Sequence, residues 1–276
     1  MKRLWESSGV RFVREMAEVY FDRRVSRSAA ELAYFLVLSF FPALICVNAF
    51  VGLLRLDVDL VLTAAGEFLP REVLPILGEY LGYVSTNQSN AMLAAGLTMV
   101  LFSASAAFRA LMNIMADIYR RPTYQGVGQV VASVLFSILF LVTIYLSMVV
   151  LLTGSWFLHL VEGWFPWVAQ LVGSWQSARF PILFCLVLLF VLLAYRLSAP
   201  KGHPRPPVLT GGVLASVSLS AASMLFSWFI GLSSRYSLVY GSLASVVILL
   251  VWLYLCGNIL ILGNVFNFVW YKRKNL

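Results

Sequence analysis

The chain has 276 residues, of which 61% are hydrophobic and 12% are charged, and its net charge is +8. A soluble domain carries about twice that share of charged residues, so the composition excludes an ordinary soluble protein and indicates an integral membrane protein. The net positive charge would also fit a nucleic-acid-binding protein. The charge gathers on alternate connections between apolar segments, however, which favours the membrane interpretation.

The first 28 residues form a basic, amphipathic segment without an apolar core. Phe12, Met16, Val19 and Tyr20 recur at helical spacing with charged residues between them. This pattern is typical of a helix that lies in the headgroup layer of a membrane. We expect membrane lipids as partners, with anionic headgroups held by the Lys and Arg residues of this segment, and no binding of nucleic acid.

Six apolar segments follow, and each is long enough to cross a bilayer as a helix. The predicted spans are 30–54, 91–113, 127–152, 180–197, 208–232 and 242–270. Their apolar residues are continuous rather than alternating, which favours helices over barrel strands. The first segment is too long for the apolar region of a signal peptide, so we expect it to be retained.

Sixteen of the 20 Lys and Arg residues lie in the N-terminal segment, in or near the second-to-third and fourth-to-fifth connections, and in the C-terminal tail. Positive connections stay cytoplasmic, and an even number of spans places both termini on one side. The sequence therefore predicts an all-α, polytopic membrane protein with both termini cytoplasmic. Residues 1–28 form a cytoplasmic amphipathic interfacial segment, and residues 29–276 form a single six-helix transmembrane domain.

The two long outer connections are expected to lie at the membrane surface. In the first, segments 56–68 and 73–83 are predicted to form short amphipathic helices separated by Pro70. The second, 155–179, holds four Trp residues. Because Trp prefers the interface, we expect it to lie on the outer leaflet, with gating of a substrate as an alternative.

The first span carries a polar face. Glu31, Tyr34 and Pro42 share this face with Leu38, because residues three, four and seven positions apart stack on a helix. Pro42 lacks a backbone donor and is expected to bend the helix. Charged residues inside spans are costly and often functional, so this face is a candidate substrate path.

A second polar face is predicted on the second span, where Ser105, Arg109 and Asn113 repeat every four residues. The first two spans run in opposite directions, so Glu31 and Arg109 are expected at similar depth near the cytoplasmic surface. We hypothesise that they form an ion pair or line a polar cavity together. The alternative is that each side chain reaches the interface separately.

The last span carries three asparagines, Asn258, Asn264 and Asn267, near Gly257. Hydrogen bonding between helices is the structural interpretation of these amides, and contact with a substrate or ion is the functional alternative. All three are kept as candidate residues of the substrate path.

A stripe of small residues is predicted on the fifth span. Gly212, Ser216 and Ser220 repeat every four residues, and with Gly257 of the last span they are expected to allow close helix packing. This stripe and the last helix could each support a homo-oligomer.

The sequence shows no catalytic or metal-binding pattern. Cys46, Cys185 and Cys256 all lie in apolar segments, and His159 and His203 fall on opposite sides of the predicted membrane. We therefore expect no catalytic residues, no metal, no cofactor and no enzymatic activity.

Three stretches resemble the YihY/BrkB family of bacterial inner-membrane proteins. They read AAELAYFLVLSFFP at 29–42, FSASAAFRALMN at 102–113, and YGSLA at 240–244 followed by GNVFN at 263–267. The resemblance implies a six-helix fold in the bacterial cytoplasmic membrane, and it adds Tyr240 to the candidate substrate path. The family has carried a ribonuclease label, which no cluster of acids or metal ligands in this chain supports. In place of the family's usual Glu in the last helix, this chain has Val265.

The bent first helix, the polar groups near the inner surface and the Trp-rich outer segment together favour a transporter or flippase-like protein that handles a lipid, a lipid-linked precursor or another amphiphile. A non-catalytic membrane scaffold or envelope-integrity factor is the alternative, and an intramembrane hydrolase is the remote one.

Overall fold

The computed structural model describes residues 8–54, 73–86, 90–121, 126–152, 175–199, 207–231 and 243–274, with the single positions 59, 62, 63 and 66. These residues are helical and contain no strand. The helices are α2 (Ser8–Asp22), α3 (Val25–Leu54), α5 (Leu74–Thr86), α6 (Asn90–Tyr119), α7 (Val127–Leu152), α10 (Trp175–Ser198), α11 (Leu209–Gly231) and α13 (Leu243–Lys274). Six of them are long and apolar enough to cross a membrane, which confirms the predicted all-α, six-span class.

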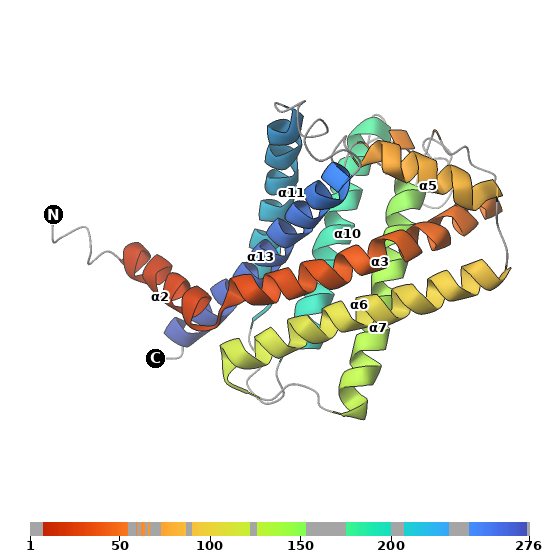
Figure 1. Cartoon of the computed structure of the whole chain (residues 1–276). Helices are drawn as coiled ribbons and strands as arrows, with labels where there is room; N and C mark the ends of the chain where they lie inside the picture. The colour runs from red at the N-terminus through yellow and green to blue at the C-terminus, as the bar shows by residue number, and fades with distance from the viewer. Residues whose placement is uncertain are drawn as a thin grey trace, which may run out of the picture.

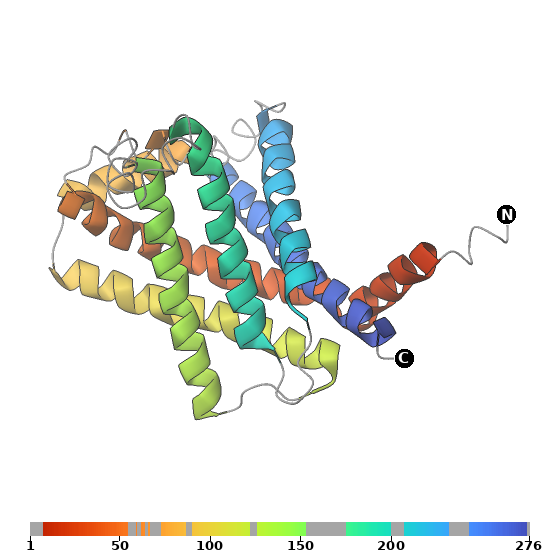
Figure 2. The same ribbon diagram turned by 180° about the vertical axis from the view of Figure 1, so that it is seen from behind.

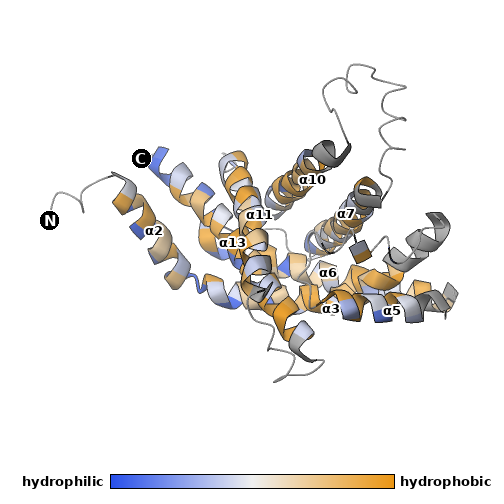
Figure 3. Cartoon of the chain, turned by 90° about the horizontal axis from the view of Figure 1, so that it is seen from above, coloured by the Kyte–Doolittle hydropathy of each residue, from blue (hydrophilic) through white to orange (hydrophobic). Residues whose placement is uncertain are grey.

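Helices α3 and α6 lie side by side and cross the direction of α7 and α10 steeply (Figures 1 and 2). In α6, 67% of the most apolar window is buried inside the protein, against 22–44% in the other five spans. Helix α6 is therefore the central helix, and the others expose most of their apolar surface outward. Figure 3 shows that the spans are mainly hydrophobic, whereas α2 mixes hydrophobic and hydrophilic residues and the C-terminal end of α13 is hydrophilic.

The contact between α3 and α6 depends on a small residue. A Cβ at Gly96 would meet Ile45 at 3.0–3.2 Å, so its missing side chain lets the two helices approach closely. Ala43, Cys46 and Val100 continue this contact as a buried cluster. Pro42 lies inside the continuous helix α3, and the bend expected there stays a prediction.

The main core lies where α3, α6, α7, α10 and α13 meet. Its fully buried members on α6 include Phe108, Leu111 and Met115. Phe136 of α7 stacks on Phe108 with 4.1 Å between ring centroids. Val265, the residue in place of the family's Glu, is fully buried in this core. A carboxylate there would need a partner to offset its desolvation.

A tight turn joins α2 to α3. Arg24 adopts a left-handed φ of 50°, and its backbone N–H donates to Phe21 O at 3.2 Å. The first spanning helix then begins at Val25, so residues 25–28 belong to α3 rather than to the interfacial segment.

The helix ends alternate between two ends of the molecule. The start of α3, the end of α6, the start of α7, the end of α10, the start of α11 and the end of α13 lie in the lower part of Figure 1, where α3 and α13 meet α2 on the left and α7 begins at the bottom. These are the connections that the Lys and Arg pattern groups on one side. The termini thus share one end of the molecule, while their cytoplasmic placement stays a prediction from charge.

Part of the first outer connection is described. Helix α5 (Leu74–Thr86) is the predicted 73–83 helix, and it packs on α3, where Tyr80 contacts Phe41 with 5.7 Å between ring centroids. The predicted 56–68 helix and the 155–179 segment lie largely outside the described residues, and Tyr240 lies wholly outside them.

Candidate functional site

The polar face of α3 points outward. Glu31 is exposed, Tyr34 is 56% exposed, and Pro42 is buried, so the three residues do not line one cavity. Glu31 forms no ion pair with Arg109, and none of the ion pairs among the described residues includes either side chain. The hypothesis that these two residues pair is therefore wrong for this structure, because Arg109 turns toward α7 instead.

Arg109 belongs to a hydrogen-bonded seam between α6 and α7. Its Nη1 donates to Ser105 Oγ at 2.8 Å, and Ser105 donates to Ser133 Oγ at 2.7 Å. Ser133 in turn donates to Val130 O at 2.9 Å. Each of the two hydroxyls both accepts and donates, so Ser105 links the Arg109 guanidinium on α6 to Ser133 on α7.

The seam continues along both helices. Leu101 lies one turn before Ser105 on α6, and its backbone O accepts a hydrogen bond from Ser137 of α7 at 3.2 Å. One turn after Arg109, Asn113 Oδ1 accepts from Gln129 Nε2 at 3.3 Å. Ser105 is buried, Arg109 is partly exposed and Asn113 is exposed, so the seam opens toward its Asn113 end. We call Ser105, Arg109, Asn113, Gln129 and Ser133 the α6–α7 polar seam.

The asparagines of α13 are used differently. Asn258 Oδ1 accepts from Tyr20 Oη of α2 at 2.9 Å, and its amide donates to Tyr254 O. Asn264 Oδ1 accepts from Tyr119 Oη of α6 at 2.8 Å. Both are at most 9% exposed, so each ties α13 to another helix from within the protein.

Asn267 caps the start of α11 from a different helix. Its Oδ1 accepts from the backbone N–H of Gly211 at 2.7 Å and from Thr210 Oγ1 at 3.1 Å. The residue just before α11 is Val208, whose side chain cannot accept a hydrogen bond. Asn267 therefore supplies the acceptor that a Ser, Thr, Asp or Asn would supply at a helix start.

Two glycines permit this cap. A Cβ at Gly211 would lie 2.0 Å from Gly263 O, and one at Gly263 would lie 2.8 Å from Gly211 O and 2.5 Å from the Tyr195 hydroxyl. Tyr195 of α10 is fully buried and donates to Leu260 O, which joins three helices at this point. We call Asn258, Asn264, Asn267, Gly211 and Gly263 the α13 network.

The predicted small-residue stripe on α11 is buried at its first two residues and exposed at its third. A Cβ on Gly212 would meet Leu192 of α10 at 2.4 Å, and Ser216 is fully buried. Ser220 is exposed and donates to Ser216 O within its own helix. On α13, a Cβ on Gly257 would meet Ala29 O of α3 at 3.2 Å.

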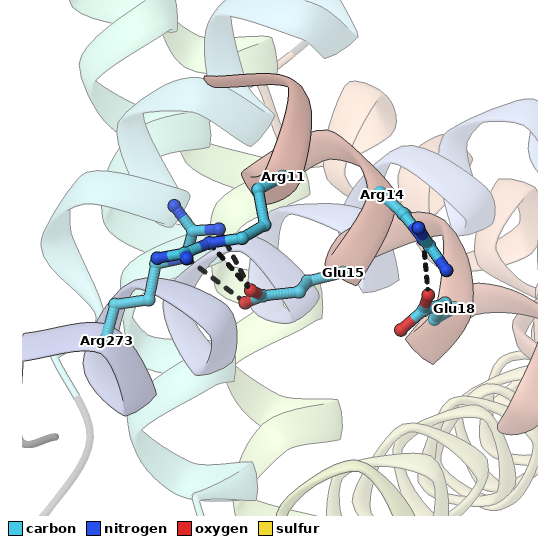
Figure 4. A network of polar contacts seen from close by, with 5 residues as sticks. All are labelled: Arg11, Arg14, Glu15, Glu18 and Arg273. Carbon is cyan, nitrogen blue, oxygen red and sulfur yellow. Dashed lines mark hydrogen bonds and ion pairs between the residues drawn. The ribbon is translucent and has the colours of Figure 1, made fainter. Parts of the chain in front are cut away.

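Helix α2 docks on the C-terminal end of α13. Arg273 donates to both carboxylate oxygens of Glu15, at 2.9 and 3.2 Å (Figure 4). Its guanidinium carbon also lies 5.2 Å from the centroid of the Phe12 ring. Phe12 also contacts Phe266 edge-on. The hydrogen bonds from Arg273 hold the pKa of Glu15 below its ordinary value of 4.5.

The apolar face of α2 that the sequence assigns to headgroups therefore has a protein partner. Phe12, Met16, Val19 and Tyr20 pack against the main core. Val13 and Phe21 lie on another face of α2 and are 65% and 76% exposed, so that face is not covered by the described part of the protein.

Sequence reasoning missed the α7 half of the seam. Gln129, Ser133 and Ser137 repeat every four residues in an otherwise apolar helix, and this spacing was the signal that could have found them. It also missed the hydrogen bonds that Tyr20, Tyr119 and Gly211 form with the asparagines of α13, because these partners are distant in sequence. Among the described residues no group of three or more His, Cys, Asp or Glu side chains could hold a metal ion.

Six apolar helices joined by polar seams define a polytopic α-helical membrane protein. The family model described as virulence factor BrkB matches residues 16–275, and the chain belongs to this family. The ribonuclease-like protein YfkH of Bacillus subtilis is 28% identical over 269 residues, which cover 96% of this chain and 97% of that protein. A UPF0761 membrane protein of Pseudomonas aeruginosa is 29% identical over 94% of this chain, and the match spans only 62% of its length. No solved structure matches.

Proposed function

We propose that the protein handles an amphiphile in the bacterial cytoplasmic membrane, as a transporter or flippase-like carrier of a lipid or lipid-linked precursor, without covalent chemistry. The observation that supports this is Arg109, a charged side chain inside an apolar helix that forms no ion pair among the described residues. A cation in a span is costly, and it persists where it faces a polar path or a ligand.

The surroundings of Arg109 suit a ligand with both polar and apolar parts. Phe102 lies two turns before Arg109 on the same face of α6 and is 69% exposed. On α7, Val130 and Val134 flank Ser133 and are 53% and 38% exposed. A headgroup placed on the polar seam would leave its acyl chains against this apolar surface, as binding to a lateral site requires.

The test is lipid movement in proteoliposomes. The purified protein is reconstituted with a trace of fluorescent phosphatidylglycerol, and dithionite is added to quench label in the outer leaflet. Protein-dependent quenching beyond the outer-leaflet fraction is the expected result, and it should fall several-fold in Arg109→Gln. Arg196→Gln is the matched control, since Arg196 is an exposed arginine in the last turn of α10. Quenching equal to that of protein-free liposomes for the wild-type protein would contradict the proposal.

A scaffold or envelope-integrity factor is the second candidate, and the α13 network favours it. The three asparagine side chains bond to α2, α6 and α11, which suits a rigid bundle rather than one that opens. A scaffold would move no lipid in the same assay and would copurify with a stoichiometric partner.

We propose membrane lipids as partners of α2 as well. Val13 and Phe21 face outward beside the exposed Arg14 and Arg24, an arrangement that supports contact with anionic headgroups. Flotation of the full protein's α2 variants with phosphatidylglycerol vesicles is uninformative, because the spans insert in any case. Quenching of a fluorophore attached at position 17 by brominated lipid tests the contact directly, and an absence of quenching would contradict it.

A further inference from the structure

We infer that Arg109, Asn113 and Gln129 form a binding site for a phosphate oxyanion, carried on a lipid headgroup or free in solution. The inference rests on the proposed function and names the chemistry that its site recognises. It depends on three features of the described residues: a cation with unused donors, an amide turned to donate, and a position at the edge of the apolar layer.

The guanidinium of Arg109 has most of its donors unused. An arginine side chain carries five N–H groups, and in the described residues one of them, on Nη1, meets Ser105. Ser105 in turn donates a hydrogen bond to Ser133 Oγ on α7. The remaining fork has the planar shape that binds two oxygens of a phosphate or carboxylate together.

Asn113 adds donors beside the guanidinium. Gln129 Nε2 occupies Asn113 Oδ1, so this hydrogen bond fixes the amide with its NH₂ group turned away from Gln129. Arg109 and Asn113 are four residues apart on one helix face, where Cβ atoms are about 6 Å apart, within the reach of both side chains to one anion. Asn113 is exposed, so an anion can enter from that end.

The level of the site along α7 matches that of a headgroup. Gln129 is the third residue of α7, which begins at Val127, and the apolar run of this helix follows it. The site therefore lies where α7 enters the apolar layer rather than at its centre. The positive end of the α7 dipole at the same level adds to the attraction of an anion.

Phosphate is the anion that this position favours. Phospholipids carry a phosphodiester or phosphomonoester at the edge of the apolar layer, and their acyl chains would continue along the exposed Phe102. Because free phosphate has the same oxygens and no acyl chain, the two sources differ only in the apolar part.

Native mass spectrometry of the full-length protein in detergent tests the site. The probes are dioleoyl phosphatidic acid, dioleoyl phosphatidylglycerol, dioleoyl phosphatidylcholine and inorganic phosphate, each titrated separately. Hydrogen bonds to a charged group are worth enough for Arg109→Gln to weaken phosphatidic acid binding about tenfold to a hundredfold. Arg109→Lys keeps the charge without the fork and should weaken it less. Asn113→Leu should weaken it several-fold, and Arg196→Gln should leave it unchanged.

Several outcomes would overturn the site. Equal binding of phosphatidic acid by the wild-type protein, Arg109→Gln and Asn113→Leu would do so, as would equal loss in Arg196→Gln. Should Arg109→Gln fail to fold, Arg109→Lys and Asn113→Leu decide alone. If inorganic phosphate binds tightly, the site is supported and its ligand is a soluble phosphate. If the phospholipids bind and inorganic phosphate does not, the site is supported and its ligand is a lipid headgroup.

The lipid-movement assay separates this inference from the proposed function. Binding that depends on Arg109 in a protein that moves no lipid would support the site and contradict transport. Lipid movement with unchanged phosphatidic acid binding in Arg109→Gln would contradict the site and leave transport standing.

Discussion

The α6–α7 polar seam and the α13 network both place polar groups inside apolar helices, yet they leave those groups in different states. In the α13 network, the side-chain oxygens of three buried asparagines all accept hydrogen bonds from other helices. In the seam, the polar groups become more exposed from Ser105 to Asn113, and among the described residues the Arg109 guanidinium bonds to one hydroxyl, that of Ser105. Polar groups satisfied within the protein hold helices together, whereas unused donors at an opening indicate a ligand.

The largest effect is expected from filling the closest contact of the α13 network. Gly211→Ala would place a Cβ 2.0 Å from Gly263 O, so α11 and α13 must separate. We expect a loss of about 3 kcal/mol of stability, measured as a drop in the Tm of the purified protein. Gly82→Ala is the matched control, because nothing lies within 4 Å of a Cβ there. A helical Gly→Ala change without a clash stabilises by about 0.5–1 kcal/mol. Equal shifts for both variants would contradict the close contact.

Removing the cap that α13 supplies should come next. Asn267→Leu leaves the backbone N–H of Gly211 without its acceptor. We expect a loss of about 2 kcal/mol, since lost helix caps cost about 0.5–2 kcal/mol and an orphaned buried donor adds to that. Hydrogen exchange should rise in the first turn of α11 above all. Protection unchanged there would show that Asn267 does not cap this helix.

A smaller effect is expected at the bond between α6 and α13. Tyr119→Phe removes the hydroxyl that donates to Asn264 while keeping the ring against Phe268. We expect a loss of about 1 kcal/mol in thermal unfolding. Tyr34→Phe, on the exposed face of α3, is the matched control and should change nothing measurable. If Tyr119→Phe leaves the Tm unchanged, the hydrogen bond between Tyr119 and Asn264 does not stabilise the contact between α6 and α13.

The docking of α2 should depend weakly on pH. Because Arg273 lowers the pKa of Glu15, the stabilisation is complete above about pH 4.5 and is lost as the pH falls through the lowered value. Both side chains are partly exposed and solvent screens the pair, so its contribution to stability is small. Fluorescence of a label on α2 should report its release in acid, and Glu15→Gln should release it in part at neutral pH. Arg14→Gln, which breaks only the exposed pair within α2, should not.

Arg109→Gln should leave the Tm nearly unchanged, although it removes a charge from the central helix. Among the described residues only one hydrogen bond, to Ser105, is lost, and Arg109 is partly exposed rather than part of the core. A large drop in Tm would make Arg109 a structural residue and would bring the seam and the α13 network into one class.

The sequence predicts the spans well because hydropathy and length act locally. The predicted ends of the spans are too early where a helix continues beyond its apolar residues. The second span was predicted to end at 113, but α6 continues to Tyr119. The face of Ser105, Arg109 and Asn113 was also predicted, from spacing alone. The helix that this face contacts was not predicted, because the rotation of α6 about its own axis decides whether the face meets Glu31 of α3 or meets α7.

The roles of the asparagines could not be separated in sequence for the same reason. Asn264 and Asn267 lie three residues apart, but one meets Tyr119 and the other meets the start of α11. Caps supplied by another helix leave no local signature. The predicted small-residue stripe included Gly212, but it did not include Gly211, where a Cβ would lie directly against Gly263 O.

Water access to the two regions separates them most directly. Cys46, Cys185 and Cys256 are replaced, and a single cysteine is placed at Asn113 or at Asn264 in the reconstituted protein. A charged, membrane-impermeant thiol reagent is then added to each side. We expect the cysteine in place of Asn113 to react from the side of the basic connections and the one in place of Asn264 to stay unreactive, since Asn113 is exposed and Asn264 is 3% exposed. Reaction at both positions, or at neither, would contradict the division between an open ligand site and a closed structural network.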